Sequence, residues 1–302
     1  MKKILINRKP VTGPWGGGNN FVKALHEYAP SHGYIPVNSL QPDIDLLFMI
    51  DPRYDELGIS INEMVDYKLK NNNARLVYRI NECDKRKGLT NDIDPLIKIA
   101  GQYIDMGIFI SNWIKDYHVD SEWKCKINPV IYSGTDKRYF CNKNKMDNGK
   151  INIVTHHWSD NFMKGQDIYE MLDEWIGSNP DYTFTYIGRT KAKFLNTNIV
   201  PAMFGKQLAN KLSAYNVYIS GSRFDPGPNH IIESLACNIP TYAIEESGGA
   251  VEMVGRDHVY SDFNDLQSIL LRKNYESNKG LVPVDWKTCI ANYFKQIEKV
   301  MQ

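Results

Sequence analysis

Short runs of apolar residues alternate along the chain with longer stretches in which apolar residues recur every three or four positions. The runs predict buried strands and the longer stretches predict amphipathic helices, and their alternation is typical of a parallel sheet flanked by helices. In the first half, strands are expected at residues 3–7, 46–50, 76–80, 104–110 and 127–131. Helices are expected between them, near residues 20–32, 61–70, 95–102 and 113–118.

A polar stretch rich in lysine and asparagine, residues 141–150, interrupts the alternation and predicts an interdomain linker. Beyond it, strands are expected at 151–155, 183–187, 217–220 and 241–244, and helices at 167–176, 206–214, 229–237, 262–273 and 286–300. The sequence therefore predicts an α/β fold with two Rossmann-like, doubly wound parallel-sheet domains facing a cleft. We expect a first domain over 1–140, a second over 141–285, and a closing helix at 286–302.

Composition excludes several classes of protein. Lys and Arg number 36 against 35 Asp and Glu, a net charge of +1, whereas nucleic-acid binders usually carry a strong basic excess. The five cysteines are odd in number and form no Cys-x-x-Cys pair, which favours reduced thiols and a cytoplasmic location over a disulfide framework or a zinc site. The first apolar run is too short for a signal peptide, and no window approaches the roughly 20 apolar residues of a membrane span.

A glycine-rich segment follows the first expected strand and leads into a helix expected to begin near Phe21. Gly16, Gly17 and Gly18 would let the backbone approach an anion closely, at a helix end that offers free N–H groups. The segment matches neither the dinucleotide fingerprint nor the phosphate loop of nucleotide triphosphatases. A tight turn needs fewer glycines than three in a row, so we favour contact with a diphosphate or a sugar.

Two carboxylates with seven residues between them occupy a Pro/Gly-rich loop and the helix that follows it. Asp225 lies on the loop and Glu233 on the helix, which is expected to begin beyond the carboxyl edge of the sheet. Open α/β sheets bind their ligands at that edge, and carboxylates accept hydrogen bonds from the vicinal hydroxyls of a sugar or ribose. The same spacing would also arise without a ligand, if Asp225 were a turn or capping residue and Glu233 a solvated helix position.

The stretch from Asp225 through Gly255 resembles the donor-binding signature of retaining glycosyltransferases of the GT-B fold, family 4. The resemblance combines the acidic pair, a turn that ends at Pro240, and a Gly-Gly-x-x-Glu segment that begins at Gly248. Shorter segments that resemble the family pattern extend over most of the chain. They include the glycine segment, Ser111-Asn112, Lys164-Gly165, Gly188-Arg189 and Asp285-Trp286.

This resemblance implies roles for individual residues. Glu233 would bind the donor ribose, and Asp225 would contact the hydroxyls of the donor sugar as a catalytic residue. Lys164, the second catalytic residue, would face the diphosphate, with Gly16–Gly18 closing over it from the acceptor-side first domain. The further donor-binding residues are Asn81, Gly188, Arg189, Ser222 and Arg223. Of these, Gly188 and Arg189 would lie near the base.

The sequence departs from the family pattern at two places. Trp158 stands where the family commonly has an arginine six residues before the lysine, and residues 79–84 lack the His-Asp pair that often follows the third strand. The candidates for the missing positive charge are His157, Arg189 and Arg223.

Two Asp-x-Asp pairs resemble a metal motif of another glycosyltransferase fold. Asp43 and Asp45 precede a strand, on the side away from the ligand edge, and Asp92 and Asp94 suit the start of a helix, where negative charge is stabilised. We therefore expect no metal site and no obligatory cofactor besides the nucleotide-sugar substrate.

Together these features predict a hexosyl or related glycosyltransferase. It would move a sugar from a nucleotide-diphosphate donor to a hydroxyl of a glycan, lipid or small-molecule acceptor, with retention of anomeric configuration. One alternative is a nucleotide-sugar epimerase of the same architecture, with Asp51 or Glu82 as the base. The other is a non-catalytic nucleotide-sugar binder. No transmembrane segment or nucleic-acid partner is expected, and contact with a membrane surface stays open because many sugar acceptors are lipids.

Overall fold

The computed structural model describes residues 1–13, 16–54, 58–142 and 145–302. Two residues of the glycine segment, Pro14 and Trp15, and two of the lysine- and asparagine-rich stretch, Lys143 and Asn144, lie outside the described residues. The chain divides into two compact units, Met1–Gly134 with Trp286–Gln302, and Thr135–Asp285. Residues 135–140 and the described part of residues 141–150 thus belong to the second unit.

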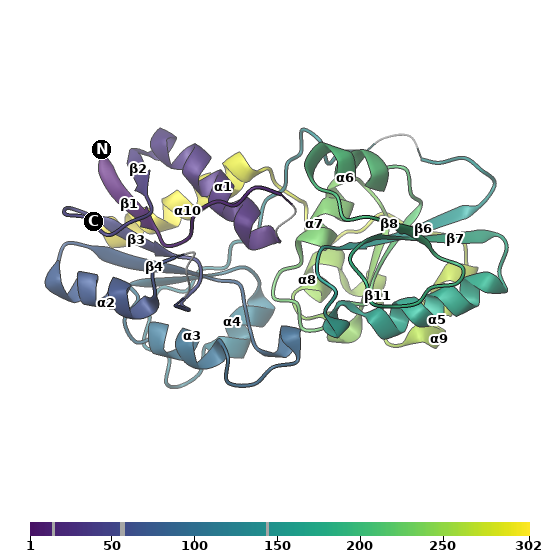
Figure 1. The fold of residues 1–302 in the computed structure, drawn as a ribbon, viewed down its shortest axis with the longest axis horizontal. Coiled ribbons are helices and arrows are strands. Elements are labelled where there is room, and N and C mark those ends of the chain that lie inside the picture. Colours follow the sequence, from purple (N-terminus) through teal and green to yellow (C-terminus); the bar gives the residue numbers. More distant parts are fainter. Residues whose placement is uncertain (14–15, 55–57, 143–144) are drawn as a thin grey trace. The chain divides into compact units, whose positions relative to one another are not determined.

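The first unit is built on a parallel sheet in the order β2-β1-β3-β4-β5 (Figure 1). Its strands are β1 (Lys2–Ile6), β2 (Tyr34–Val37), β3 (Leu46–Met49), β4 (Arg75–Ile80) and β5 (Met106–Phe109). Its helices are α1 (Gly17–Tyr28), α2 (Ile61–Lys70), α3 (Asp94–Ala100), α4 (Asn112–His118) and α10 (Trp286–Met301). Figure 1 shows α1 and α10 on one side of this sheet and α2, α3 and α4 on the other.

Helices on both faces explain why strands of this unit such as β3 and β5 are continuous apolar runs. All four residues of β3 are buried, because neither face of the sheet reaches solvent there. On the side of α1 and α10, Phe21 packs with ring centroids 5.8 Å from Phe48 and 4.8 Å from Tyr293. The apolar face of α10 is therefore part of the core of the first unit.

The second unit has a parallel sheet in the order β11-β10-β9-β6-β7-β8. Its strands are β6 (Ile151–His157), β7 (Tyr182–Gly188), β8 (Asn198–Val200), β9 (Val217–Ser220), β10 (Thr241–Ile244) and β11 (Val259–Tyr260). Its helices are α5 (Gln166–Gly177), α6 (Gly205–Leu212), α7 (Asn229–Ala236), α8 (Ala250–Val254) and α9 (Phe263–Leu271), with short 3-10 turns at η3 (Phe162–Lys164) and η4 (Glu245–Ser247). In Figure 1, α5 and α9 lie on one side of this sheet and α6 on the other.

The structure corrects one expected strand. Residues 127–131 form only an isolated bridge, between Val130 and Phe109 of β5. Backbone hydrogen bonds still join the segment to β5, from Gly107 N–H to Ile127 and from Phe109 N–H to Pro129. Pro129 has no N–H to donate back to Gly107, so the pairing is interrupted there and is complete only where Ile131 N–H donates to the Phe109 carbonyl at 2.8 Å.

Four short elements were not expected, namely β2, β8, β11 and α8. Three of these elements, β2, β8 and β11, are edge strands. An edge strand pairs with a neighbour on one side only, and each of these three has partly exposed residues. β2 contains Pro36, which an edge strand tolerates, and β11 has two residues. Such segments carry too few apolar residues for a periodic pattern.

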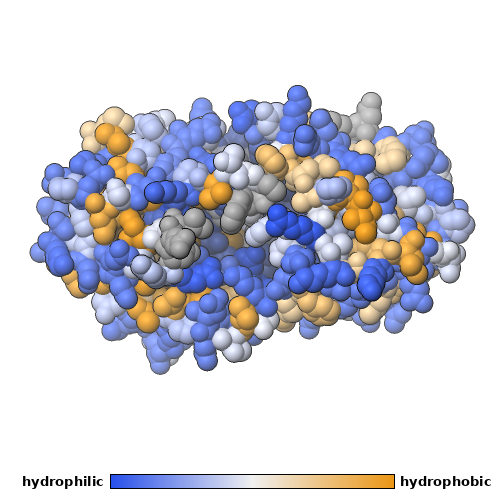
Figure 2. Space-filling view, in the orientation of Figure 1, coloured by the Kyte–Doolittle hydropathy of each residue, from blue (hydrophilic) through white to orange (hydrophobic). Residues whose placement is uncertain are grey.

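On the face that Figure 2 shows, the surface is largely polar, and apolar residues appear there in small separate groups. All five cysteines are free thiols. In the described ranges, no helix combines the length and the apolar character that a bilayer crossing requires.

Candidate functional site

The carboxyl ends of β6 and β9 lie side by side at the point where the chain changes direction across the second sheet. From β6 the chain proceeds to β7 and β8 on one side, and then returns to add β9, β10 and β11 on the other. Open α/β sheets bind ligands at such a switch point, because the loops after the two strands diverge there. The loops that follow β6 and β9 carry the residues that the sequence singled out.

Lys164 and Asp225 meet at this point as an ion pair. Lys164 ends the 3-10 turn η3 after β6, and Asp225 lies on the loop after β9. The Lys164 Nζ lies 2.6 Å from Asp225 Oδ2, and the two side chains are only 12% and 7% exposed. A short, charge-assisted bond between nearly buried partners fixes the ammonium group in place.

The loop that carries Asp225 is anchored to η4 by its backbone. Asp225 N–H donates to the Ser247 carbonyl at 3.1 Å, and Gly249 N–H donates to the Asp225 carbonyl at 2.9 Å. Gly248 has a φ of 76°, and a Cβ there would lie 2.8 Å from the Asp225 carbonyl oxygen. The first glycine of the signature's Gly-Gly segment, Gly248, is thus required for the close approach of two backbones.

A buried hydroxyl group anchors the start of the same loop. The Tyr169 hydroxyl accepts from the Gly221 N–H at 3.0 Å and from the Thr155 hydroxyl at 3.1 Å, and lies 2.7 Å from His157 Nε2. Burial raises the pKa of Tyr169 to about 12, so the phenol keeps its proton at neutral pH. Residues from β6, α5 and the loop after β9 are therefore joined through one atom.

Glu233 forms a second pair across the switch point. It lies on α7, and its Oε2 lies 2.8 Å from Nε2 of His156 on β6. The side chains of His156 and Glu233 are 10% and 12% exposed. His156 was not among the expected site residues, because a histidine inside a strand gives no sign of the helix that it will face.

Of the candidates for the missing positive charge, His157 is excluded by its surroundings. Burial, followed by the nearby charges of His230, Lys164 and His156, holds the pKa of His157 well below its ordinary value. The ring is therefore uncharged at neutral pH.

Arg223 is charged but already engaged. Its guanidinium donates to both oxygens of Asp167 at 2.8 and 2.7 Å, and its Nε donates to Glu246 at 3.2 Å. A donor phosphate would have to compete with these two carboxylates. The Arg189 side chain is exposed, next to a backbone that donates to the His157 carbonyl at 3.1 Å.

The remaining predicted residues of this unit lie around the same strand ends. Gly188 ends β7 with a φ of 138°, and a Cβ at this position would overlap the His157 carbonyl. Ser222 is 1% exposed, and its hydroxyl has no hydrogen-bond partner within the part of the chain that the structure describes. A small pocket beside Lys164 is lined by Asp160, Asn161, Lys164, Gln166, Tyr186 and Thr190.

Gly165 gives a prediction for stability, because its φ is 93° and a Cβ would overlap the backbone of Gly221. Gly149 has a φ of 71° but has nothing within 4 Å of its Cβ position, so Gly149→Ala is a matched control. We expect Gly165→Ala to lose about 1–3 kcal/mol more free energy of unfolding than the control, because of the added clash. Urea denaturation of both variants measures the difference, and equal losses would contradict the close packing.

The predicted residues of the first unit lie near the start of α1. Gly16 is the N-cap of that helix, and Gly17 and Gly18 form its first turn, so the helix begins earlier than the expected Phe21. Among the side chains that the structure describes, none caps this end of the helix. A Cβ at Gly18 would lie 3.8 Å from Asn81 Nδ2.

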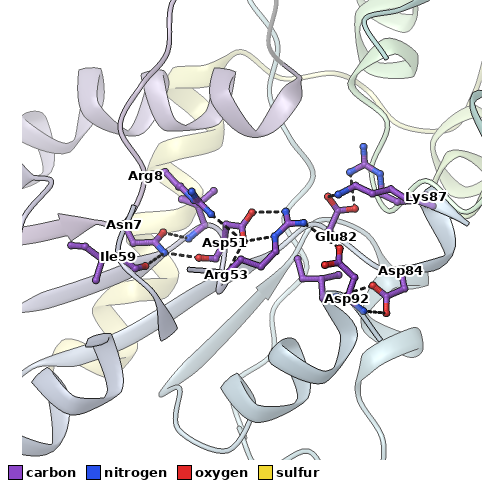
Figure 3. A network of polar contacts seen from close by, with 12 residues as sticks. Asn7, Arg8, Asp51, Arg53, Ile59, Glu82, Asp84, Lys87 and Asp92 are labelled. Carbon is purple, nitrogen blue, oxygen red and sulfur yellow. Dashed lines mark hydrogen bonds and ion pairs between the residues drawn. The ribbon is translucent and has the colours of Figure 1, made fainter. Parts of the chain in front are cut away.

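A charged network follows β1 and β3, at the switch point of the first sheet (Figure 3). Arg53 donates to both oxygens of Asp51 at 3.0 and 2.7 Å, and Arg8 lies 3.3 Å from the same carboxylate. Burial alone would raise the pKa of Asp51, but hydrogen bonds and charge from Arg53, with the charge of Arg8, lower it below its ordinary value. A general base needs a raised pKa, so this environment disfavours Asp51 as the base of an epimerase.

The other acidic residues of interest in the first unit have structural partners. Glu82 lies 3.1 Å from Arg86 and 3.8 Å from Lys87. Asp45 accepts from the Lys3 N–H at 2.6 Å just before β3, and Asp94 lies in the first turn of α3. In the described residues, no group of three or more His, Cys, Asp or Glu side chains is arranged to hold a metal ion.

The sequence matches no protein-family model and no curated protein sequence. Solved structures nevertheless match almost the whole chain. HepE from Anabaena, in complex with UDP and glucose, has a TM-score of 0.71 at 12% identity, over 99% of each chain. This chain has the GT-B fold.

Two further structures agree with that assignment. A sucrose-phosphate synthase from Thermosynechococcus elongatus has a TM-score of 0.66 at 15% identity, over 100% of this chain and 95% of that one. A glycosyltransferase from Rickettsia africae has a TM-score of 0.64 at 13% identity, over 99% and 92%. At these identities the likeness establishes the fold.

Proposed function

We propose that the protein is a retaining glycosyltransferase of the family 4 type, which uses a nucleoside-diphosphate sugar as donor and a hydroxyl group as acceptor. The observation that carries this proposal is the pair of contacts at the switch point of the second sheet, Lys164 with Asp225 and His156 with Glu233. A cation and two carboxylates at this sheet edge support a donor site formed by the residues of the donor-binding signature that the sequence resembles. The UDP complexes of HepE support a uridine nucleotide as the first donor to test.

Each residue of the site has a role in this proposal. Glu233 accepts hydrogen bonds from the ribose, Asp225 from hydroxyls of the sugar, and Lys164 neutralises charge on the diphosphate. In the transition state the bond from the anomeric carbon to the diphosphate breaks as the acceptor hydroxyl attacks. Negative charge then builds on the leaving group, and a fixed cation stabilises that state more than the bound donor.

The further donor contacts of the second unit follow the same proposal. Ser222 offers a hydroxyl that has no partner among the described residues, and Arg189 offers an exposed cation near the end of β7. Together with Lys164 they would compensate for the arginine that the family commonly has at the position of Trp158.

We assign the acceptor to the first unit. Its switch point carries Arg8, Asp51 and Arg53, whose paired charges offer both donors and acceptors to a hydroxylated molecule. The glycines at the start of α1 and Asn81 would contact the donor from this unit. A glycan, a lipid and a small molecule would each present the required hydroxyl.

We expect that no metal ion is required for transfer, since Lys164 and backbone N–H groups would supply the positive charge that stabilises the leaving diphosphate. Turnover in EDTA is therefore expected to stay within about twofold of the untreated rate, far from the 10²-fold or larger loss expected for a missing electrostatic contact. The measurement is release of nucleoside diphosphate with and without the chelator. Loss of turnover that Mg²⁺ or Mn²⁺ restores would contradict this part of the proposal.

A thermal-stability screen tests the donor assignment first. A ligand that binds only the folded protein raises its stability by mass action, by about 2.7 kcal/mol at 100 times its Kd. We expect one class of nucleoside diphosphate among UDP, GDP and ADP, and one of its sugar derivatives, to raise the melting temperature of the wild-type chain. No shift with any of them at millimolar concentration would contradict the proposal.

A further inference from the structure

Glu233 is held by His156 on β6, which is held in turn by Tyr218 on the neighbouring strand β9. His156 Nε2 lies 2.8 Å from Glu233 Oε2, and His156 Nδ1 lies 3.1 Å from the hydroxyl of Tyr218 on β9. The backbone N–H of His156 donates to the same hydroxyl at 3.0 Å. The imidazole is therefore fixed at both of its nitrogens.

The direction of the contact with Glu233 follows from its chemistry. A carboxylate only accepts hydrogen bonds, so His156 Nε2 donates to it whichever protonation state the ring adopts. Tyr218 is completely buried, and burial raises the pKa of its hydroxyl well above the ordinary value. The support behind the imidazole is thus a rigid, protonated phenol.

This arrangement uses one oxygen of Glu233 and leaves the other available. Within the described residues, Glu233 Oε1 makes no hydrogen bond, and it is not among the buried polar atoms that lack a partner. Oε1 is therefore the oxygen that reaches solvent, in a side chain that is only 12% exposed.

We propose that His156 is a positioning residue that gives the site its selectivity for ribonucleotides. By holding Oε2, it aims Oε1 so that this oxygen accepts hydrogen bonds from the ribose hydroxyls of a nucleoside diphosphate. This inference rests on the proposed ribose role of Glu233.

The physical reason is preorganisation. A glutamate without a fixed neighbour samples many rotamers, and ordering it when the ligand binds reduces the affinity. The Tyr218–His156–Glu233 chain has already ordered the carboxylate in the free protein. Removing the imidazole should therefore weaken the ribose contact and leave the diphosphate contacts of Lys164 unchanged.

The experiment compares a ribonucleoside diphosphate with its 2′,3′-dideoxy form. The probe is whichever of UDP, GDP and ADP most stabilises the wild-type chain, and both forms are titrated by calorimetry into the full-length protein. The wild type should bind the ribose form roughly 10- to 100-fold more tightly, as expected for hydrogen bonds to a charged group. His156→Leu should bring this ratio close to one, with affinity for the dideoxy form within about threefold of wild type.

Two milder variants keep the test decisive if His156→Leu fails to fold. His156→Gln retains an N–H donor and is expected to preserve most of the ratio. Tyr218→Phe removes only the hydroxyl behind the ring, and is expected to give an intermediate ratio.

The possible failures are distinguishable. If the His156–Glu233 pair only stabilises the packing of α7 on β6, His156→Leu lowers the melting temperature and lowers the affinities for the ribose and dideoxy forms by the same factor. The ratio of the two affinities then stays at its wild-type value, and this result overturns the inference. A wild-type ratio near one, or a ratio that Glu233→Ala does not alter, overturns the ribose role itself.

Discussion

Lys164→Ala is expected to lower kcat by on the order of 100-fold or more, by analogy with the loss of a preorganised electrostatic contact. The Lys164 ammonium is held 2.6 Å from Asp225, so it is in place before charge develops on the leaving diphosphate. Affinity for the donor should fall by a smaller factor, because the diphosphate is already anionic in the ground state. Steady-state kinetics with saturating acceptor separate the two effects.

Lys191→Ala is the matched control for this variant. Lys191 is 73% exposed and lies 3.4 Å from Asp160, which lines the pocket beside Lys164. Its loss removes one positive charge from the same region without touching Asp225, and kcat should stay within about twofold. Lys164→Arg should rescue only partly, because a planar guanidinium does not reproduce a compact ammonium. Turnover near the wild-type value in folded Lys164→Ala would contradict the catalytic role.

A stability measurement must accompany these kinetics. Lys164→Ala leaves the 7%-exposed carboxylate of Asp225 without its cation, which is costly in a nearly buried position. Adding Asp225→Asn to Lys164→Ala removes that charge. If the double variant regains stability, the stability lost in Lys164→Ala belongs to the unpaired carboxylate of Asp225, and the turnover of Lys164→Ala is then compared at a temperature where that variant is folded.

Glu233→Ala is expected to weaken donor binding by roughly 1.5–3 kcal/mol, the usual range for hydrogen bonds to a charged group. Glu233 Oε1 reaches solvent at the carboxyl edge of the sheet, while Oε2 is held by His156. Calorimetry with the donor or its nucleoside diphosphate measures the change in Kd.

The control for Glu233→Ala is Glu174→Ala, which removes a carboxylate from an exposed position on α5. Its affinity for the donor should equal that of the wild type. Unchanged affinity in folded Glu233→Ala would show that the ribose assignment is wrong.

The fold could be predicted from the sequence because its central strands are buried on both faces. β3 is apolar at every position, and β6, β7 and β9 contain short groups of apolar and β-branched residues between helical patterns. The edge strands β2, β8 and β11 could not be predicted, since they are short and partly exposed. The expected strand at 127–131 was wrong because Pro129 interrupts a ladder that its apolar neighbours would otherwise continue.

The site was predictable only where chemistry and turn signals coincide. Asp225 and Lys164 stand beside Pro226 and Gly165 after strands, and Glu233 lies on the helix that follows the Pro/Gly-rich loop, so their position at the sheet edge follows from the local sequence. Their partners could not be inferred, because His156 and Glu233 are separated by 77 positions and meet only through the order of the strands. The charge state of His157 could not be predicted from the sequence either, because the burial and the neighbouring residues that lower its pKa arise only from the fold.

The most direct test of sugar transfer is release of nucleoside diphosphate from a panel of nucleotide sugars, with and without a panel of glycan, lipid and small-molecule acceptors. Glycosyl transfer predicts release that depends on an acceptor, a product heavier by one sugar residue, and loss of both in Lys164→Ala. Epimerised donor in the absence of any acceptor, or tight donor binding with no acceptor-dependent release across the panel, would contradict it.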